Sequence, residues 1–231
     1  MTARIALSER LQAVVDMVPP CAVAADIGCD HGKAAAALLL CGKAARTVCA
    51  DISELSLDKA RNLSREYGLE AAMSLRAGDG LSVLAPGEAD AAVIAGMGGL
   101  LIADILKAGI SGAPDTLVLS PNRDAAVLRG TLTALGYRID DEALVCEGGH
   151  YYPVIRAMRG QSPQLTAAEL EFGPVLLKNR PEVLRRFVQR RVQETRVVRE
   201  RVAGSESPRR ESLLAQADGR LAHYEEVLKC L

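Results

Sequence analysis

The chain has 231 residues, of which 49% are hydrophobic, and its 28 Lys+Arg and 29 Asp+Glu give a formal net charge of −1. This length accommodates one full α/β domain and a small appendage with a real core. No run of 18 apolar residues occurs, so we expect no membrane span. The six cysteines include no C-x-x-C pair, which favours reduced thiols in a cytoplasmic protein.

Strand-like and helix-like segments alternate through the first 160 residues. A helix over 7–18 is followed by strands over 21–27, 47–52, 72–77, 90–95 and 115–119, with helices over 31–42, 53–67, 99–108 and 123–136 between them. Nearly continuous apolar strands separated by helices predict a parallel sheet covered on both faces. Two more strands, 137–146 and 151–158, are joined by a short turn and must therefore be antiparallel to each other. The sequence predicts an α/β fold with a Rossmann-like sheet of seven strands, the last one antiparallel.

Residues 161–231 have a helical pattern instead. Pro181 begins a long helix that ends near Val202, residues 204–208 break it, and a second helix follows. Apolar residues in both helices recur at spacings of three and four, which predicts an antiparallel coiled-coil hairpin. We therefore expect two domains, 1–160 and 161–231.

The charge is unevenly distributed between these domains. Residues 1–160 carry 15 Lys+Arg and 19 Asp+Glu, whereas residues 161–231 carry 13 and 10. Residues 178–202 alone hold nine basic and three acidic side chains. Such a helix suits phosphate contacts with a nucleic acid, although a solvated helix face or a dimer seam would look the same.

The turn after the first strand carries the main chemical signal. Asp26-Ile27-Gly28 leads from an apolar strand into an alanine-rich helix, and such a turn brings bare backbone close to a ligand. The dinucleotide fingerprint G-x-G-x-x-G is absent. An acidic residue two before the turn glycine instead resembles the first motif of S-adenosylmethionine (SAM) methyltransferases. Cys29 and His31 lack further spaced ligands, so we expect no metal site.

Candidate SAM contacts recur at the ends of the next three strands, where open α/β sheets bind ligands. We expect Asp26 to accept from the ammonium group, Asp51 to hold the ribose hydroxyls and Asp79 to reach the adenine amine. Taken singly, Asp51 could be an ordinary acid before a helix, and Asp79-Gly80 an ordinary turn. The full set of predicted cofactor residues is Asp26, Gly28, His31, Asp51, Ile52, Asp79, Gly80, Gly96, Met97 and Gly98.

Five segments together resemble one family. They are Leu7-Ser8-Glu9-Arg10-Leu11, Ala25-Asp26-Ile27-Gly28-Cys29-Asp30-His31, Ile94-Ala95-Gly96-Met97-Gly98-Gly99, Ser120-Pro121-Asn122 and Glu147-x-x-x-Tyr151-Tyr152. In this order they resemble the bacterial tRNA (adenine-22-N1)-methyltransferases, the TrmK family, over essentially the whole chain. The resemblance implies SAM-dependent methylation of N1 of an adenine in tRNA. The chain departs from the family pattern at Gly32-Lys33-Ala34-Ala35, where an aromatic residue and a proline are expected.

The chemistry of adenine N1 suggests the remaining roles. Its lone pair is available at neutral pH, so the enzyme must chiefly align N1 with the methyl group. A carboxylate would stabilise the cationic product, and we expect Asp26, or as the second choice Asp30, in that role, with Asn122 positioning the base edge. The predicted substrate-binding residues are Arg10, Asn122, Tyr151, Arg185, Arg186, Arg190 and Arg191. We expect a monomer or weak homodimer that binds tRNA.

Three alternatives remain open on the sequence. An NAD-binding oxidoreductase is disfavoured by the missing fingerprint and the terminal strand hairpin. A non-catalytic RNA-binding protein is disfavoured by the acidic residues at 26, 51 and 79. A methyltransferase for a small molecule, whose hairpin only dimerises, would keep its activity without residues 161–231.

Overall fold

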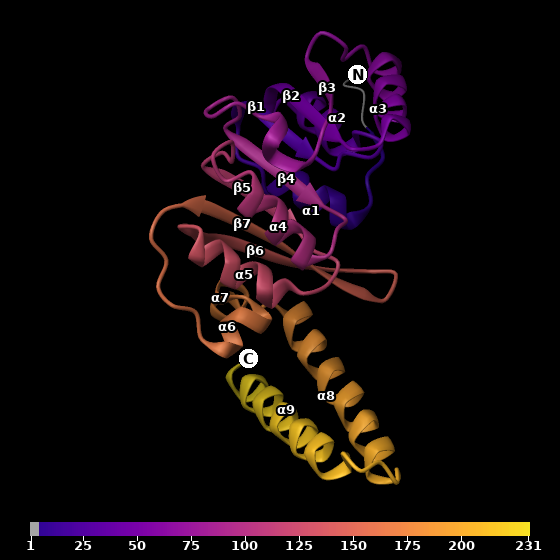
Figure 1. The fold of residues 1–231 in the computed structure, drawn as a ribbon, viewed down its shortest axis with the longest axis vertical. Helices are drawn as coiled ribbons and strands as arrows, with labels where there is room; N and C mark the ends of the chain where they lie inside the picture. The colour runs from indigo at the N-terminus through magenta and orange to yellow at the C-terminus, as the bar shows by residue number, and fades with distance from the viewer. Residues whose placement is uncertain (1–4) are drawn as a thin grey trace. The chain divides into compact units, whose positions relative to one another are not determined.

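The structure, a computed structural model of the chain, describes residues 5–231. The chain divides into two compact units, Met1–Leu165 and Thr166–Leu231. The first contains a sheet with helices and the second contains helices (Figure 1). Among residues 5–231, no helix is both long and apolar enough to cross a membrane.

Seven strands of the first unit form one sheet in the order β3-β2-β1-β4-β5-β7-β6. The strands β1 to β5 pair in parallel, whereas β7 pairs antiparallel with both of its neighbours, β5 and β6. The predicted seven-stranded sheet with an antiparallel last strand is confirmed. The strand bounds are β1 (Cys21–Ile27), β2 (Ala44–Asp51), β3 (Met73–Ala77), β4 (Ala91–Ala95), β5 (Thr116–Ser120), β6 (Tyr137–Glu147) and β7 (His150–Arg159).

Helices cover both faces of this sheet, with α4 and α5 in front of the strands in Figure 1 and α1 and α2 behind them. On the α1–α2 face, Val14 and Leu38 pack into one apolar cluster with Val93 and Val118 of the central strands. Such burial of aliphatic side chains is the main stabilising contribution to the fold. The helices are α1 (Glu9–Met17), α2 (Lys33–Leu40), α3 (Glu54–Glu66), α4 (Gly99–Ala108) and α5 (Ala125–Ala134), with a 3₁₀ turn η1 (Gly80–Val83).

Two helices start later than the sequence suggested, and the backbone explains both. Asp30 and Gly32 are left-handed, with φ of 45° and 67°, so α2 begins at Lys33 and not at His31. Asp124 is also left-handed, with φ of 59°, so α5 begins at Ala125. Asp and Gly adopt this region more readily than other residues. Both delays leave a loop, not a helix, beside the carboxyl end of a strand.

The hairpin of β6 and β7 extends past the end of β5, the strand with which β7 pairs. The two strands pair from Tyr137 and Arg159 to Glu147 and His150, whereas β5 pairs only with residues 155–158 of β7. Residues 144–153 therefore project beyond β5 (Figure 1). The left-handed residues Gly148 and Gly149 make the tight two-residue turn.

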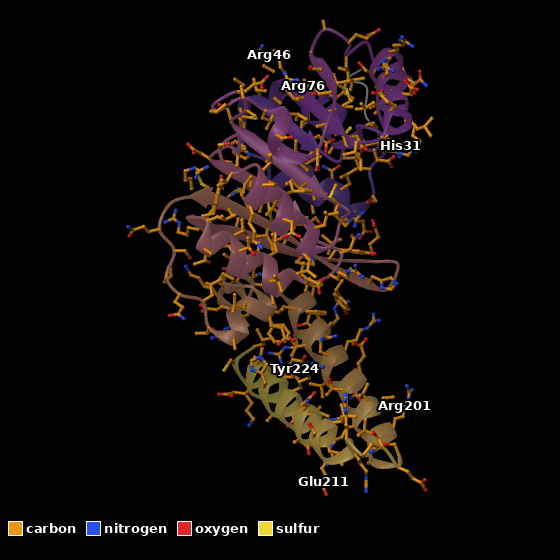
Figure 2. All side chains as sticks on the ribbon, in the orientation of Figure 1. His31, Arg46, Arg76, Arg201, Glu211 and Tyr224 are labelled. Atoms are coloured by element: carbon orange, nitrogen blue, oxygen red, sulfur yellow. The ribbon has the colours of Figure 1, made fainter. Side chains whose placement is uncertain are left out.

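The second unit consists of α6 (Ala167–Phe172), α7 (Pro174–Asn179), α8 (Glu182–Ala203) and α9 (Arg210–Cys230). The last two form an antiparallel hairpin, with Arg201 and Glu211 near its turn (Figure 2), which confirms the predicted coiled-coil hairpin. Its buried side chains are Leu184, Val188 and Val192 on α8 and Ala217, Tyr224 and Val227 on α9.

Candidate functional site

The strand order creates a switch point between β1 and β4. From β1 the chain continues to β2 and β3 on one side, and then returns to place β4 on the other side. In open α/β sheets, the crevice at the carboxyl ends of two such strands is where ligands bind. Here that crevice lies between the turn at Gly28 and the turn at Gly96.

A cavity of about 570 Å³ occupies this position; we call it the switch-point cavity. Six of its lining residues were predicted as site residues: Arg10, Asp26, Gly28, His31, Gly96 and Met97. The other lining residues are Leu11, Cys29, Asp30, Lys33, Ala34 and Ala95. Leu11, Cys29, Asp30 and Ala95 belong to the family-like segments but were not predicted as site residues, and Lys33 and Ala34 lie where the chain departs from the family pattern.

Gly28 allows the turn after β1 and the turn after β4 to lie close together. Its φ is 69°, a region that side chains disfavour, and a Cβ built on it would lie 1.9 Å from Cε of Met97. Its N–H donates to the carbonyl of Ala50 on β2 at 2.8 Å. The bare backbone at Gly28 therefore allows the Met97 side chain to reach across the switch point.

Asp26 is a buried carboxyl group in the wall of this cavity. It is 5% exposed, and its Oδ2 accepts a hydrogen bond from the backbone N–H of Ala35 at 3.2 Å. Burial, opposed by the Ala35 hydrogen bond and assisted by the charge of Asp51, raises the pKa of Asp26 to about 7. A carboxyl group with this pKa changes its charge readily on meeting a cationic ligand.

Asp51 at the end of β2 holds the turn that follows β1. Its Oδ2 accepts from the N–H of Asp30 at 3.1 Å, and its Oδ1 accepts from the N–H of Ser53 at 2.9 Å. Each carboxylate oxygen keeps a further lone pair. The interpretation of Asp51 as an acid before a helix is thus partly right, but the side chain also ties two strand ends together.

His31 lines the cavity and pairs with Asp30. Its Nδ1 is 2.5 Å from Oδ2 of Asp30, and Nζ of Lys59 is 3.2 Å from Oδ1. Slight burial acts to raise the pKa of Asp30, but the contacts with His31 and Lys59 lower it below its usual value. Asp30 therefore remains an ionised, exposed carboxylate at the mouth of the cavity.

Beyond Asp51, the edge of the sheet offers an apolar surface and a carboxylate. Ile52 is 78% exposed, and the exposed Asp79 precedes Gly80 without a side-chain capping bond. A Cβ on Gly80 would lie 2.8 Å from the Ile105 side chain, and Leu101, one turn earlier on α4, is 54% exposed. Ile52 follows Asp51 directly, and Leu101 lies one helical turn from Ile105, the residue that packs against Gly80. Sequence reasoning missed Leu101 because a helical leucine looks like core.

The loops after β4 and β5 are joined by hydrogen bonds. Asn122 donates from its backbone N–H to the Met97 carbonyl at 2.8 Å and from Nδ2 to the Gly96 carbonyl at 2.6 Å. The Gly99 N–H donates to the Arg123 carbonyl at 2.8 Å. The glycine-rich turn and the Ser120-Pro121-Asn122 segment, separate in the sequence, form one structure beside the cavity.

Arg10 joins this structure from α1. Its Nη1 donates to Oδ1 of Asn122 at 2.6 Å, and its guanidinium lies 4.7 Å from the ring centre of Tyr152. Its backbone N–H, free of an intrahelical partner in the first turn of α1, donates to Glu147 at 3.4 Å. Tyr151, which we predicted as a substrate contact, is half-buried in β7 and does not line the cavity. Adjacent strand residues point to opposite faces, and only the tertiary structure assigns Tyr152 to Arg10.

The arginines predicted on the long helix belong to the second unit and differ from one another. Arg186 is exposed, Arg185 and Arg190 pair with Glu182 and Glu194 on their own helix, and Arg191 contacts the hydroxyl of Tyr224. Farther along, Arg196 and Arg199 pair with Glu225 and Asp218 of α9. The part of α8 available for phosphates is therefore smaller than its sequence suggests.

No group of three or more His, Cys, Asp or Glu side chains that could hold a metal ion occurs among residues 5–231.

Comparison with known proteins agrees with this geometry. A family model described as a methyltransferase domain matches residues 7–155. The tRNA (adenine(22)-N(1))-methyltransferase of Bacillus subtilis is 33% identical over an alignment that covers 96% of this chain and 97% of that protein. The crystal structure of B. subtilis TrmK matches with a TM-score of 0.87 at 33% identity, covering 97% of this chain and 100% of that one.

A further solved structure, from Streptococcus pneumoniae, is described in complex with S-adenosyl-L-methionine. It is 27% identical, covers 96% of this chain and 100% of its own, and has a TM-score of 0.85. The agreement extends over nearly the full length of both chains, so it includes the helical hairpin as well as the sheet. The chain therefore belongs to the family of tRNA (adenine(22)-N(1))-methyltransferases.

Proposed function

We propose that this protein transfers a methyl group from SAM to N1 of adenine 22 in tRNA. The observation that carries the proposal is the switch-point cavity, because all residues in its wall except Lys33 and Ala34 come from the segments that resemble this family. The family relation, which covers 96% of the chain, gives the substrate class. The oxidoreductase alternative is not supported, because residues 7–155 match a methyltransferase domain.

The residues at this edge of the sheet fit the parts of SAM. Asp26 in the cavity wall suits the ammonium group, and the two oxygens of Asp51 keep lone pairs for ribose hydroxyls. Asp79 suits the adenine amine, and the exposed side chains of Ile52 and Leu101 suit the faces of the adenine ring. Gly28, His31, Gly80, Gly96, Met97 and Gly98 complete the proposed cofactor site. When bound, SAM supplies a methyl group on a sulfonium ion, which is open to attack by a lone pair.

The residues near Asn122 would hold the base. Adenine N1 carries an accessible lone pair, so no residue has to remove a proton before the attack. N1 is hidden by pairing in a duplex, so the base must be unpaired or turned out of its stack. After transfer the base is cationic, and the carboxylate of Asp26 is the proposed stabilising charge. Its position in the cavity wall and its pKa of about 7 support that role.

Residues 161–231 are the proposed tRNA-binding domain, and residues 1–160 the proposed catalytic domain. Arg185, Arg186 and Arg190 suit contacts with the RNA backbone, which add affinity without reading sequence. Arg191 has a second, structural role because it contacts Tyr224. We further propose a cytoplasmic monomer or weak homodimer, consistent with a tRNA substrate and with six free cysteines.

The direct test is methyl transfer from labelled SAM to bulk bacterial tRNA, followed by nucleoside analysis. We expect 1-methyladenosine, and a transcript with guanine at position 22 should remain unlabelled. SAM binding without any transfer to RNA would contradict the proposal and favour a small-molecule substrate.

Asp51→Ala should weaken SAM binding by at least tenfold, because it removes the proposed ribose acceptor and two backbone hydrogen bonds. Calorimetric titration with SAM measures the loss, and binding to tRNA should not change. Asp58→Ala is the matched control, since Asp58 is an exposed carboxylate on α3 that pairs with Arg61. Equal SAM affinity of the Asp51 variant and the control would remove Asp51 from the cofactor site.

Charge reversal of Arg185, Arg186 and Arg190 to Glu should raise the KM for tRNA about tenfold or more and flatten its salt dependence. Arg191 is left unchanged because its contact with Tyr224 supports the hairpin. The affinity for SAM should stay the same. Reversal of the exposed Arg46 and Arg138 of the first unit provides the control. An unchanged KM with a steep salt dependence would exclude this part of α8 from the RNA site.

A further inference from the structure

We propose that Arg10 is a positioning residue that fixes the side-chain amide of Asn122, and that Asn122 thereby reads the N6–N7 edge of the target adenine and leaves N1 open. This inference rests on the proposed function and goes beyond it in naming how the base is selected. It is carried by a hydrogen-bond arrangement that orients one amide.

The side-chain amide of Asn122 has one defined orientation. A carboxamide can be placed with its oxygen and nitrogen exchanged. In Asn122, Oδ1 accepts from Nη1 of Arg10 at 2.6 Å and Nδ2 donates to the Gly96 carbonyl at 2.6 Å. A guanidinium can only donate and a carbonyl can only accept, so the exchanged orientation would break both bonds. Arg10 and Gly96 therefore define a single orientation of Asn122.

Arg10 is itself held in place. Its guanidinium lies over the ring of Tyr152 at 4.7 Å, and its backbone N–H donates to Glu147. Both partners come from the projecting hairpin of β6 and β7. The Nε atom of Arg10 is buried and has no hydrogen-bond partner among the described residues. Leaving a buried donor unpaired has an energetic cost. The position of the Arg10 guanidinium is therefore kept although it lowers the stability of the fold.

The amide of Asn122 keeps hydrogen-bonding capacity for a ligand. With one bond made by each polar atom, Oδ1 keeps one lone pair and Nδ2 keeps one N–H. Asn122 is exposed, and its two hydrogen-bond partners, Arg10 and Gly96, both line the switch-point cavity. One acceptor and one donor match the N6 amine and N7 of adenine, the pair that Asn reads in nucleic acids. Guanine presents an oxygen at position 6, which would face Oδ1 and repel it.

This contact would also leave N1 free. The N6–N7 edge is distinct from the ring position that carries N1, so recognition does not occupy the nucleophilic lone pair. Arg10 itself would not touch the base, and its effect on the reaction would pass through Asn122. That distinguishes it from a residue that binds a tRNA phosphate or the cofactor.

The test crosses variants with base analogues at position 22. A tRNA carrying 7-deazaadenine lacks the N7 acceptor, and one carrying unsubstituted purine lacks the N6 amine, but both keep N1. With the unmodified protein, we expect each analogue to lower kcat/KM about tenfold or more relative to adenine. In Asn122→Ala the preference for adenine over 7-deazaadenine should disappear, and the preference over purine should shrink to the part caused by loss of the electron-donating N6 amine. Arg10→Met should weaken the same preference, because only the bond to the Gly96 carbonyl then orients the amide.

Non-additivity provides the second readout. The double variant of Arg10→Met and Asn122→Ala should have the kcat/KM of Asn122→Ala within about twofold, because both changes remove one interaction. Arg10→Lys should recover part of the preference, since Lys retains a donor. SAM affinity, measured by calorimetry, should change less than twofold in each variant. Arg46→Met is the control, because Arg46 is an exposed arginine at the other end of the parallel strands (Figure 2).

Three results would overturn the inference. They are losses of kcat/KM that multiply in the double variant, an undiminished preference for adenine over 7-deazaadenine in Arg10→Met or Asn122→Ala, and a large loss of SAM affinity in Arg10→Met. Each assigns Arg10 a direct contact or Asn122 another role. Failure of the proposed function is distinguishable, because the unmodified protein would then form no 1-methyladenosine on any of these RNAs.

Discussion

Asp26→Asn is expected to weaken SAM binding by about 10- to 100-fold and to lower methyl transfer by a further factor, while making the free protein more stable. Asparagine has nearly the same shape and keeps an oxygen for the Ala35 N–H, but it cannot carry charge. The loss of SAM affinity is that of a charge-assisted hydrogen bond. The further loss in rate comes from the missing carboxylate beside the cationic product.

The pH dependence of this effect follows from the raised pKa. In the folded protein the pKa of Asp26 is about 7, against 3.8 when unfolded, so the folded state holds this proton more tightly. The free energy of unfolding therefore decreases as pH rises from about 4 to 7, and this loss of stability persists above pH 7. At pH 8 this destabilisation is on the order of 4 kcal/mol, and Asp26→Asn should recover part of it.

Two measurements check these expectations. Calorimetric titration from pH 6 to 8 should show SAM affinity rising with pH in the unmodified protein and remaining flat in Asp26→Asn. Urea unfolding at pH 5 and pH 8 should show the variant gaining stability relative to the unmodified protein at the higher pH. Flat SAM affinity across pH 6–8 in the unmodified protein would contradict the ammonium contact.

Gly99→Ala is expected to lower methyl transfer about 100-fold or more, although Gly99 touches no proposed ligand. A Cβ at this position would lie 2.4 Å from the carbonyl oxygen of Asp124 and 2.8 Å from that of Arg123. Both are backbone atoms, so the loop after β5 must move. That loop carries Asn122, and a displacement of 1 Å at a reacting centre has large effects on rate.

Stability should fall as well, by about 1–3 kcal/mol, because the core must accept an extra methyl group. Gly219→Ala on α9 is the matched control, since nothing lies within 4 Å of its Cβ. In a helix this change should stabilise by about 0.5–1 kcal/mol. Tm from calorimetry and methyl transfer at saturating SAM measure both effects. Full activity in Gly99→Ala would mean that the two loops tolerate separation.

The sequence by itself determined the sheet and the order of its motifs. Apolar strands, helix caps and turn glycines are local signals, and they located the strand ends and hence Asp26, Asp51, Asp79 and Gly96. The short turn at Gly148 fixed the antiparallel pairing of the last two strands, because no crossover fits there. The spacing in residues 161–231 determined the helical hairpin for the same local reason.

The tertiary structure alone decided which of these residues meet. The position of β7 between β5 and β6 is a choice among sheet edges, which no local pattern encodes. It brings Tyr152, and not Tyr151, to Arg10, across a separation of more than 100 residues. The joining of the Gly96 and Asn122 loops, the burial that raises the pKa of Asp26, and the pairing of Arg199 with Asp218 likewise depend on contacts distant in sequence. Local propensity sets the elements, whereas packing and burial between distant elements set the chemistry of the site.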